Sequence, residues 1–143
     1  MKKLLLASAL FVVSVSPAFA ARNPWVGTWK PDYAKSNYIE VTGPLVISTP
    51  SPGIMRWEYP TIETTLEGKP DGSAMSIRSP HLPKGIVETV KLLTPMKLTY
   101  RIFVNGRLDK HGTDEISADG STFTATSWIG RSHIKLVEVF DRE

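Results

Sequence analysis

Ten prolines divide the chain beyond residue 21 into short pieces, and they limit its possible folds more than any other feature. Proline cannot donate to a strand ladder, and inside a helix it removes a hydrogen bond and clashes with the preceding turn. The pieces between the prolines show no helical spacing of apolar residues over ten or more positions. They carry short alternating runs of Thr, Val, Ile and aromatic residues instead, and such runs predict β-strands. The predicted fold class is therefore all-β.

The alternating runs predict strands joined by tight turns, and one short helical turn. The predicted strands are 25–29, 38–41, 44–49, 53–59, 61–67, 74–79, 86–93, 96–104, 107–116, 121–128 and 133–140, and the helical turn is 32–35. A long antiparallel meander protects its edge strands by closing into a barrel. We therefore expect one antiparallel up-and-down β-barrel of about eight to ten strands, in a single domain over 21–143.

The first 20 residues have the three-part layout of a secretory signal peptide. Two lysines follow the initial methionine, residues 4–15 are apolar, and small residues precede a cleavage site at Ala20. The apolar run is too short to span a membrane. We expect cleavage after Ala20, and a mature protein located in the periplasm or secreted from the cell.

Composition argues against several partners and chemistries. Loss of the two signal lysines leaves 15 basic residues against 14 acidic ones, so the charge excess typical of nucleic-acid binding disappears. The chain has no cysteine, which excludes disulfides and a thiol nucleophile. A membrane-spanning barrel needs longer strands with an unbroken apolar outer band. The predicted strands are mostly shorter and carry charges on both faces, so we expect a soluble barrel.

Short motifs stand at both ends of the predicted mature domain. Residues 26–30 read Val-Gly-Thr-Trp-Lys, so that Gly27 stands two positions before Trp29 at the start of the first strand. Residues 116–121 read Ile-Ser-Ala-Asp-Gly-Ser, and residues 139–142 read Val-Phe-Asp-Arg. These motifs resemble those of lipocalins and the wider calycin superfamily. More narrowly, the set is similar to that of small exported bacterial lipocalin-like proteins.

This resemblance implies both an architecture and a structural cluster. The architecture is an up-and-down barrel with a cavity that opens at one end. In the family, the tryptophan of the first strand plugs the closed end and an arginine from the last strand stacks across it. Trp29 matches the tryptophan, Arg142 is the closest candidate for the arginine, and Arg131 is the alternative. Gly27, Trp29 and Arg142 are therefore expected to form the base of the barrel.

The Asn-Gly pair at 105–106 is the strongest turn signal, because it supplies the positive φ angles of a type I′ turn. A two-residue turn there places Tyr100 opposite His111 and Ile102 opposite Asp109. Direct cross-strand partners share a face of the sheet, so a polar stripe would continue the apolar face of the preceding strand. The alternative is a three-residue loop with a β-bulge, which shifts the register and turns that stripe toward solvent.

An inward polar stripe fits a water-accessible cavity better than a packed core, because buried charges without partners are costly. The stripe consists of Arg107, Asp109, His111 and Thr113. The predicted ligand-binding residues are Trp57, Tyr59, Leu98, Tyr100, Ile102, Asp109 and His111. They combine an apolar body with a few polar groups, which is how ligand cavities are built.

No pattern predicts catalysis, a metal site or a cofactor. His81, His111 and His133 are too far apart in sequence for a close-spaced pair of metal ligands. A Gly-x-Ser-x-Gly elbow is absent from the sequence. The adjacent carboxylates Asp114 and Glu115 point to opposite faces of a strand and do not share a site.

These patterns leave three functions open, in a definite order. The first is reversible binding of a small apolar or amphipathic molecule in the barrel cavity. The second is an envelope interaction or inhibitor-like module that binds a protein through its loops, and the third is a barrel enzyme. The proline-rich segment 70–85 is either a lid at the cavity mouth or an ordinary surface loop, and both interpretations stay open.

Overall fold

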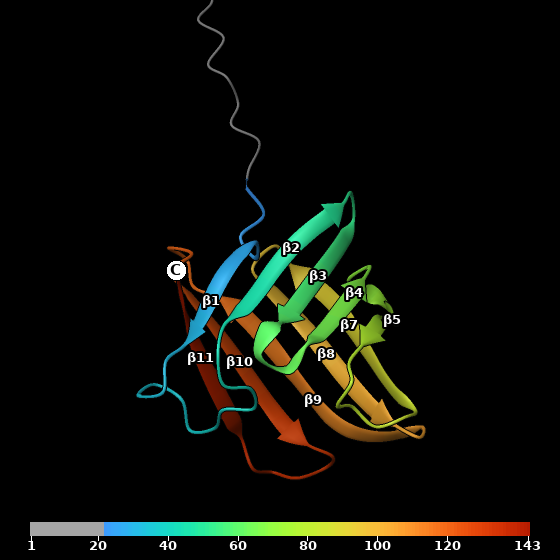
Figure 1. Cartoon of the computed structure of the whole chain (residues 1–143). Helices are drawn as coiled ribbons and strands as arrows, with labels where there is room; N and C mark the ends of the chain where they lie inside the picture. The colour runs from blue at the N-terminus through green and yellow to red at the C-terminus, as the bar shows by residue number, and fades with distance from the viewer. Residues whose placement is uncertain (1–21) are drawn as a thin grey trace, which may run out of the picture.

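The computed structural model describes residues 22–143, so the predicted signal peptide lies outside the described residues. Within them, eleven strands form one antiparallel sheet, and the 3-10 helix η1 (Pro60–Ile62) interrupts the chain once. The strands are β1 (Gly27–Pro31), β2 (Leu45–Ser51), β3 (Ile54–Tyr59), β4 (Thr64–Gly68), β5 (Asp71–Ala74), β6 (Ser76–Arg78), β7 (Ile86–Thr94), β8 (Lys97–Val104), β9 (Arg107–Ile116), β10 (Thr122–Ile129) and β11 (Leu136–Arg142). Figure 1 shows the sheet curling into a barrel, which confirms the predicted all-β, lipocalin-like architecture.

The barrel closes through one bent segment of chain. The strand order is β5-β7-β8-β9-β10-β11-β1-β2-β3-β4-β6, so β5 and β6 are the two edges of the sheet. Only Met75 separates these strands in the sequence, and its N–H donates to the carbonyl oxygen of Glu88 on β7 (2.8 Å). The bend at Met75 lets one segment pair with β7 on one side and with β4 on the other. Both edges of the sheet are thereby brought together, which limits the unpaired edge.

Four predicted segments differ from the structure. In the predicted strand 61–67, the first residues belong to the 3-10 helix η1, and the strand begins only at Thr64. Residues 38–41 form a loop rather than a strand, because the Glu40 N–H donates to the Glu138 side chain (2.7 Å) instead of to a strand ladder. The predicted helical turn is an isolated turn in which Asp32 Oδ1 accepts hydrogen bonds from the next N–H groups. The segment 70–85 is only partly a loop, since it supplies β5 and β6 before a connection over 79–85.

One end of the barrel is closed around Trp29, whose side chain is fully buried (0% exposed). Arg142 is its register partner on β11, and the guanidinium carbon lies 4.1 Å from the centre of the Trp29 ring. The same guanidinium donates to the carbonyl oxygens of Val26 (2.8 Å) and Gly120 (2.7 Å). Arg142 therefore ties the segment before β1 and the β9–β10 connection to the end of the barrel, whereas Arg131 lies in the β10–β11 connection at the opposite end.

The glycine two positions before Trp29 has a steric reason. A Cβ atom at Gly27 would lie 2.5 Å from Nη1 of Arg142, so only glycine leaves room for the stacked guanidinium. Trp25 completes the closed end, because its indole N–H donates to the carbonyl oxygen of Pro95 in the β7–β8 turn (2.8 Å). In the Gly-X-Trp motif, Gly27 thus leaves space for the guanidinium group of Arg142, and Trp29 fills the closed end of the barrel.

Candidate functional site

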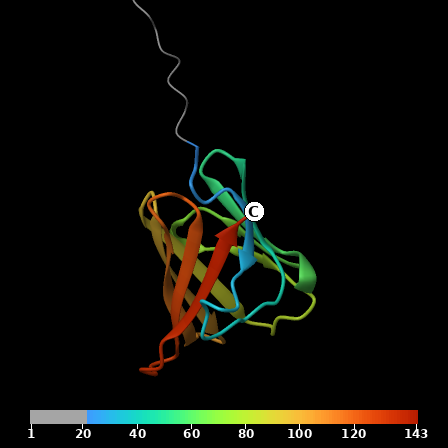
Figure 2. The same ribbon diagram turned by 90° about the vertical axis from the view of Figure 1, so that its left-hand side faces the viewer.

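The barrel contains a cavity of about 420 Å³ between the closed end and the opposite mouth. This volume falls within the range of pockets that hold small organic molecules. The mouth lies among the connections at the far end of the strands, where Val41, Leu82 and Pro83 line it. In Figure 2 the loop that follows β1 (cyan) crosses this lower end of the barrel.

The two sides of the cavity differ in chemistry. The β2–β4 side is mostly apolar and is lined by Leu45, Trp57, Tyr59, Thr64 and Leu66. The β7–β11 side carries ionisable side chains among apolar ones. These ionisable groups are Glu88, Tyr100, Asp109, Lys110, Asp114 and Glu138. The cavity is therefore amphipathic across its width.

Six of the seven predicted ligand-binding residues line this cavity: Trp57, Tyr59, Leu98, Tyr100, Ile102 and Asp109. The structure brings them together from β3, β8 and β9, which lie on both sides of the barrel. Their role in ligand binding stays a prediction. His111 is not part of the cavity lining, and the cause is a change of register in β9.

The Asn-Gly turn at 105–106 forms as predicted, with positive φ angles of 50° and 77°. Val104 also pairs with Arg107, as a two-residue turn requires. Beyond this point β9 carries one extra residue, so that Ile102 pairs with Lys110. A bulge of this kind shifts every later residue of the strand to the opposite face.

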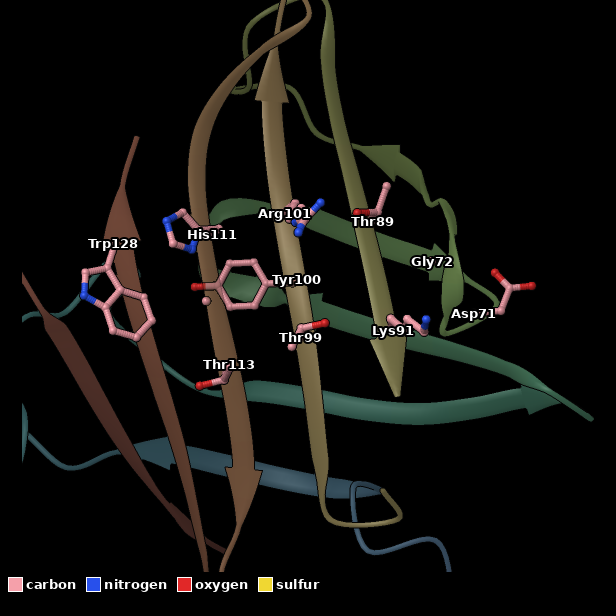
Figure 3. A pocket seen from close by; sticks show the side chains of 11 residues that line it. Asp71, Gly72, Thr89, Lys91, Thr99, Tyr100, Arg101, His111, Thr113 and Trp128 are labelled. Carbon is pink, nitrogen blue, oxygen red and sulfur yellow. The ribbon is translucent and has the colours of Figure 1, made fainter. Parts of the chain in front are cut away.

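The predicted pairing of Tyr100 with His111 is therefore wrong. Tyr100 pairs with Gly112, while His111 lies on the outer wall opposite Arg101. Figure 3 shows His111 and Trp128 side by side on this outer wall, and their rings stack with centres 5.6 Å apart. They line a polar outer hollow of about 560 Å³, together with residues of β5, β7 and β8.

Gly112 makes room for the ring of Tyr100. A Cβ atom at Gly112 would lie 2.8 Å from Cε1 of that ring, so glycine is needed where the ring crosses the wall. Ser127 is the register partner of Gly112 on β10. Burial, the largest effect, raises the pKa of Tyr100 above its usual range and outweighs the side chain of Ser127, which acts to lower it, so the phenol stays neutral at physiological pH.

Lys110 is an almost completely buried cation (5% exposed) that the bulge turns inward. Its Nζ lies 2.5 Å from Oε2 of Glu40 and 5.5 Å from the centre of the Tyr38 ring. The backbone N–H of Glu40 in turn donates a hydrogen bond to the side chain of Glu138. Lys110 therefore forms its ion pair and its cation–π contact with residues of the loop at the mouth.

Asp114 and Glu88 have no such partner. Neither forms an ion pair within residues 22–143. Asp114 is 8% exposed, and its Oδ1 has no hydrogen-bond partner. Burial, followed by the charge of Glu88, raises the pKa of Asp114 well above its usual range. Burial, followed by the charge of Glu40, raises the pKa of Glu88 to about 7.

The sequence analysis missed these interior acids for two different reasons. Glu88 stands two positions from both Ile86 and Val90, so the alternation of β7 already places it inward. Asp114 is different, because its side of the sheet depends on the bulge at Asp109, which no sequence signal marks. Alternation alone is sufficient to find Glu88, whereas Asp114 faces inward only in the alternative register with a β-bulge.

The sequence matches no protein-family model and no curated protein. Among residues 22–143, no group of three or more His, Asp or Glu side chains is placed to hold a metal ion. No helix in this described part is long and apolar enough to cross a membrane. The function must therefore be inferred from the geometry of the barrel.

Proposed function

We propose that this chain is an exported protein of lipocalin type that reversibly binds a small amphipathic molecule inside its barrel. The observation that carries the proposal is the cavity of about 420 Å³ with one mostly apolar side and one polar side. The signal-like N-terminus and the Gly-X-Trp motif support export and the family assignment.

The apolar side supplies the binding free energy. Trp57 and Leu66 are register partners and Leu45 lies on the neighbouring strand, and all three are buried and line the cavity. Burial of apolar surface contributes about 25 cal/mol per Å², from which the cost of association must be subtracted. A probe of ten to twenty heavy atoms should therefore bind with about micromolar affinity.

Titration with the fluorescent apolar probe N-phenyl-1-naphthylamine tests this function. The variant Ala125→Phe fills the cavity, because Ala125 is a partly buried lining residue of β10. The matched control is Thr124→Phe, which adds a similar ring one position earlier, on the outer face. We expect probe fluorescence to rise with the unchanged protein and with Thr124→Phe, and affinity to fall at least about tenfold in Ala125→Phe. Equal binding by both variants, or none by the unchanged protein, would contradict the function.

A further inference from the structure

The polar side of the cavity has an excess of acid. Lys110 is the one cationic side chain among its lining residues in the described part of the chain, and Glu40 already pairs with it. The remaining lining acids are Glu88, Asp109, Asp114 and Glu138. A carboxylate accepts hydrogen bonds and carries no donor of its own. A ligand that fits this side must therefore bring donors, and a positive charge matches it best.

Asp114 is where this requirement is strongest. Its direct register partners are Leu98 on β8 and Ala125 on β10, and neither of these two side chains can hydrogen-bond to it. Its Oδ1 is buried without a hydrogen bond, whereas nearly all buried polar atoms in proteins have a partner. Asp114 lines the cavity, so a donor carried by a ligand can reach this carboxylate and hydrogen-bond to it.

We propose that the barrel ligand carries a protonated amine that binds to the carboxylate of Asp114, with its apolar body against the β2–β4 side; this rests on the proposed function. An ammonium group has three donors and no acceptor, which complements a carboxylate that lacks them. Lys110 does not take this place, because its ammonium is held at the mouth by Glu40. The acidic side chains of the cavity would repel a ligand with a carboxylate head group, so we expect such a ligand to bind weakly.

Binding of the amine changes the protonation of the protein. Burial raises the pKa of Asp114 and brings that of Glu88 to about 7, and an ammonium group beside either carboxyl favours its charged form, so binding of the amine shifts protons from these groups to the buffer. When the ammonium binds, the carboxyl O–H bond breaks, its proton goes to the buffer, and the carboxylate accepts an N–H hydrogen bond from the ligand. The ammonium keeps all its own protons. A bound alcohol of the same length releases no proton.

Calorimetry with three probes of equal chain length tests the head group. The probes are octylamine, octanol and octanoate, each titrated at pH 7.5 in two buffers that differ in ionisation enthalpy. We expect octylamine to bind about 10- to 100-fold more tightly than octanol, the usual gain from a hydrogen bond between charged groups. We also expect proton release with octylamine alone, and the weakest binding for octanoate.

Two variants of β9 locate the charge. Asp114→Asn removes the charge with little change of shape and should lower octylamine affinity at least about tenfold, while octanol affinity stays the same. The matched control is Glu115→Gln, a neighbouring carboxylate on the exposed outer face, which should leave both affinities unchanged.

The outcomes separate the two proposals. If octanol and the naphthylamine probe bind but octylamine binds no more tightly and releases no proton, the amine assignment is wrong and the binding function stands. Wild-type octylamine affinity in a folded Asp114→Asn variant has the same meaning. If none of the probes binds the unchanged protein, the binding function itself fails.

Discussion

Among single residues, those at the closed end show how short motifs encode a precise contact. Gly27, Trp29 and Arg142 come from both ends of the described chain and meet where β1 pairs with β11. Each has a separate role, because the glycine leaves space, the indole fills the barrel and the guanidinium covers it. The resemblance to lipocalins implied the stacking of Arg142 on Trp29, whereas the steric reason for Gly27 is visible only in the structure.

Removal of the Trp29 side chain should strongly destabilise the fold. Trp29→Ala leaves a cavity in the closed end and removes the surface on which Arg142 stacks, so we expect a loss of about 3–5 kcal/mol in the free energy of unfolding. Trp128→Ala is the control, because this indole lies on the outer wall against His111 and its loss should cost much less. Urea denaturation of both variants measures the difference. Equal losses in the two would contradict the proposed role of Trp29.

For the strands, the central feature is the bulge in β9. The turn at 105–106 and the first cross-strand pair followed from the Asn-Gly signal, because turn chemistry is local. The extra residue at Asp109 has no such signal, and it reverses the facing of every residue after it. Regular alternation placed Asp109 and His111 inward. Asp109 lines the cavity, but His111 faces outward, as the alternative with a β-bulge predicted, and Lys110 and Asp114 face inward instead.

Deletion of Asp109 should be tolerated, because it removes only the extra residue. Lys110 then still pairs with Ile102, and the later pairs of β9 are unchanged. The expected cost is about 1 kcal/mol, since the Gly130 N–H loses the Asp109 carbonyl oxygen to which it donates a hydrogen bond.

Deletion of Thr113 is the matched comparison. This residue lies within the regular ladder, so its removal turns Asp114 outward or forces the whole strand to slip. We expect this variant to unfold or to lose most of its stability. Thermal unfolding followed by circular dichroism compares the two deletions, and a Thr113 deletion as stable as the Asp109 deletion would contradict the bulge assignment.

The barrel as a whole combines features that could be predicted from sequence with others that could not. Proline spacing and alternation were sufficient for the all-β meander, because each strand is a local pattern. The closure at Met75 was not predictable, since one segment pairs with two strands that are distant from each other along the sheet. The acidic interior also arises only on closure, when β7, β9 and β11 bring their carboxyls to a common space.

This interior predicts that the unliganded barrel loses stability as pH rises above the acid range. The pKa of Glu88 is about 7 in the folded barrel, against an ordinary value of 4.5. The ionisable groups around Glu88 are Glu40, Tyr59, Tyr100, Lys110 and Asp114. Below pH 4.5 the carboxyl is protonated in both the folded and the unfolded chain, so it does not affect their balance. Between pH 4.5 and 7 the unfolded chain releases the proton more readily, so the free energy of unfolding falls as pH rises.

The variant Glu88→Gln should remove this part of the pH dependence. The difference between pKa values of 4.5 and about 7 corresponds to about 3 kcal/mol. The free energy of unfolding of the variant should therefore exceed that of the unchanged protein by up to this amount at pH 8, and the two should be equal at pH 4. Asp114 adds a loss of the same sign, because its pKa is also raised, and it should persist in the variant. Urea denaturation at pH 4, 6 and 8 measures both profiles. Parallel profiles for the two proteins would show that Glu88 ionises as freely in the folded barrel as in the unfolded chain.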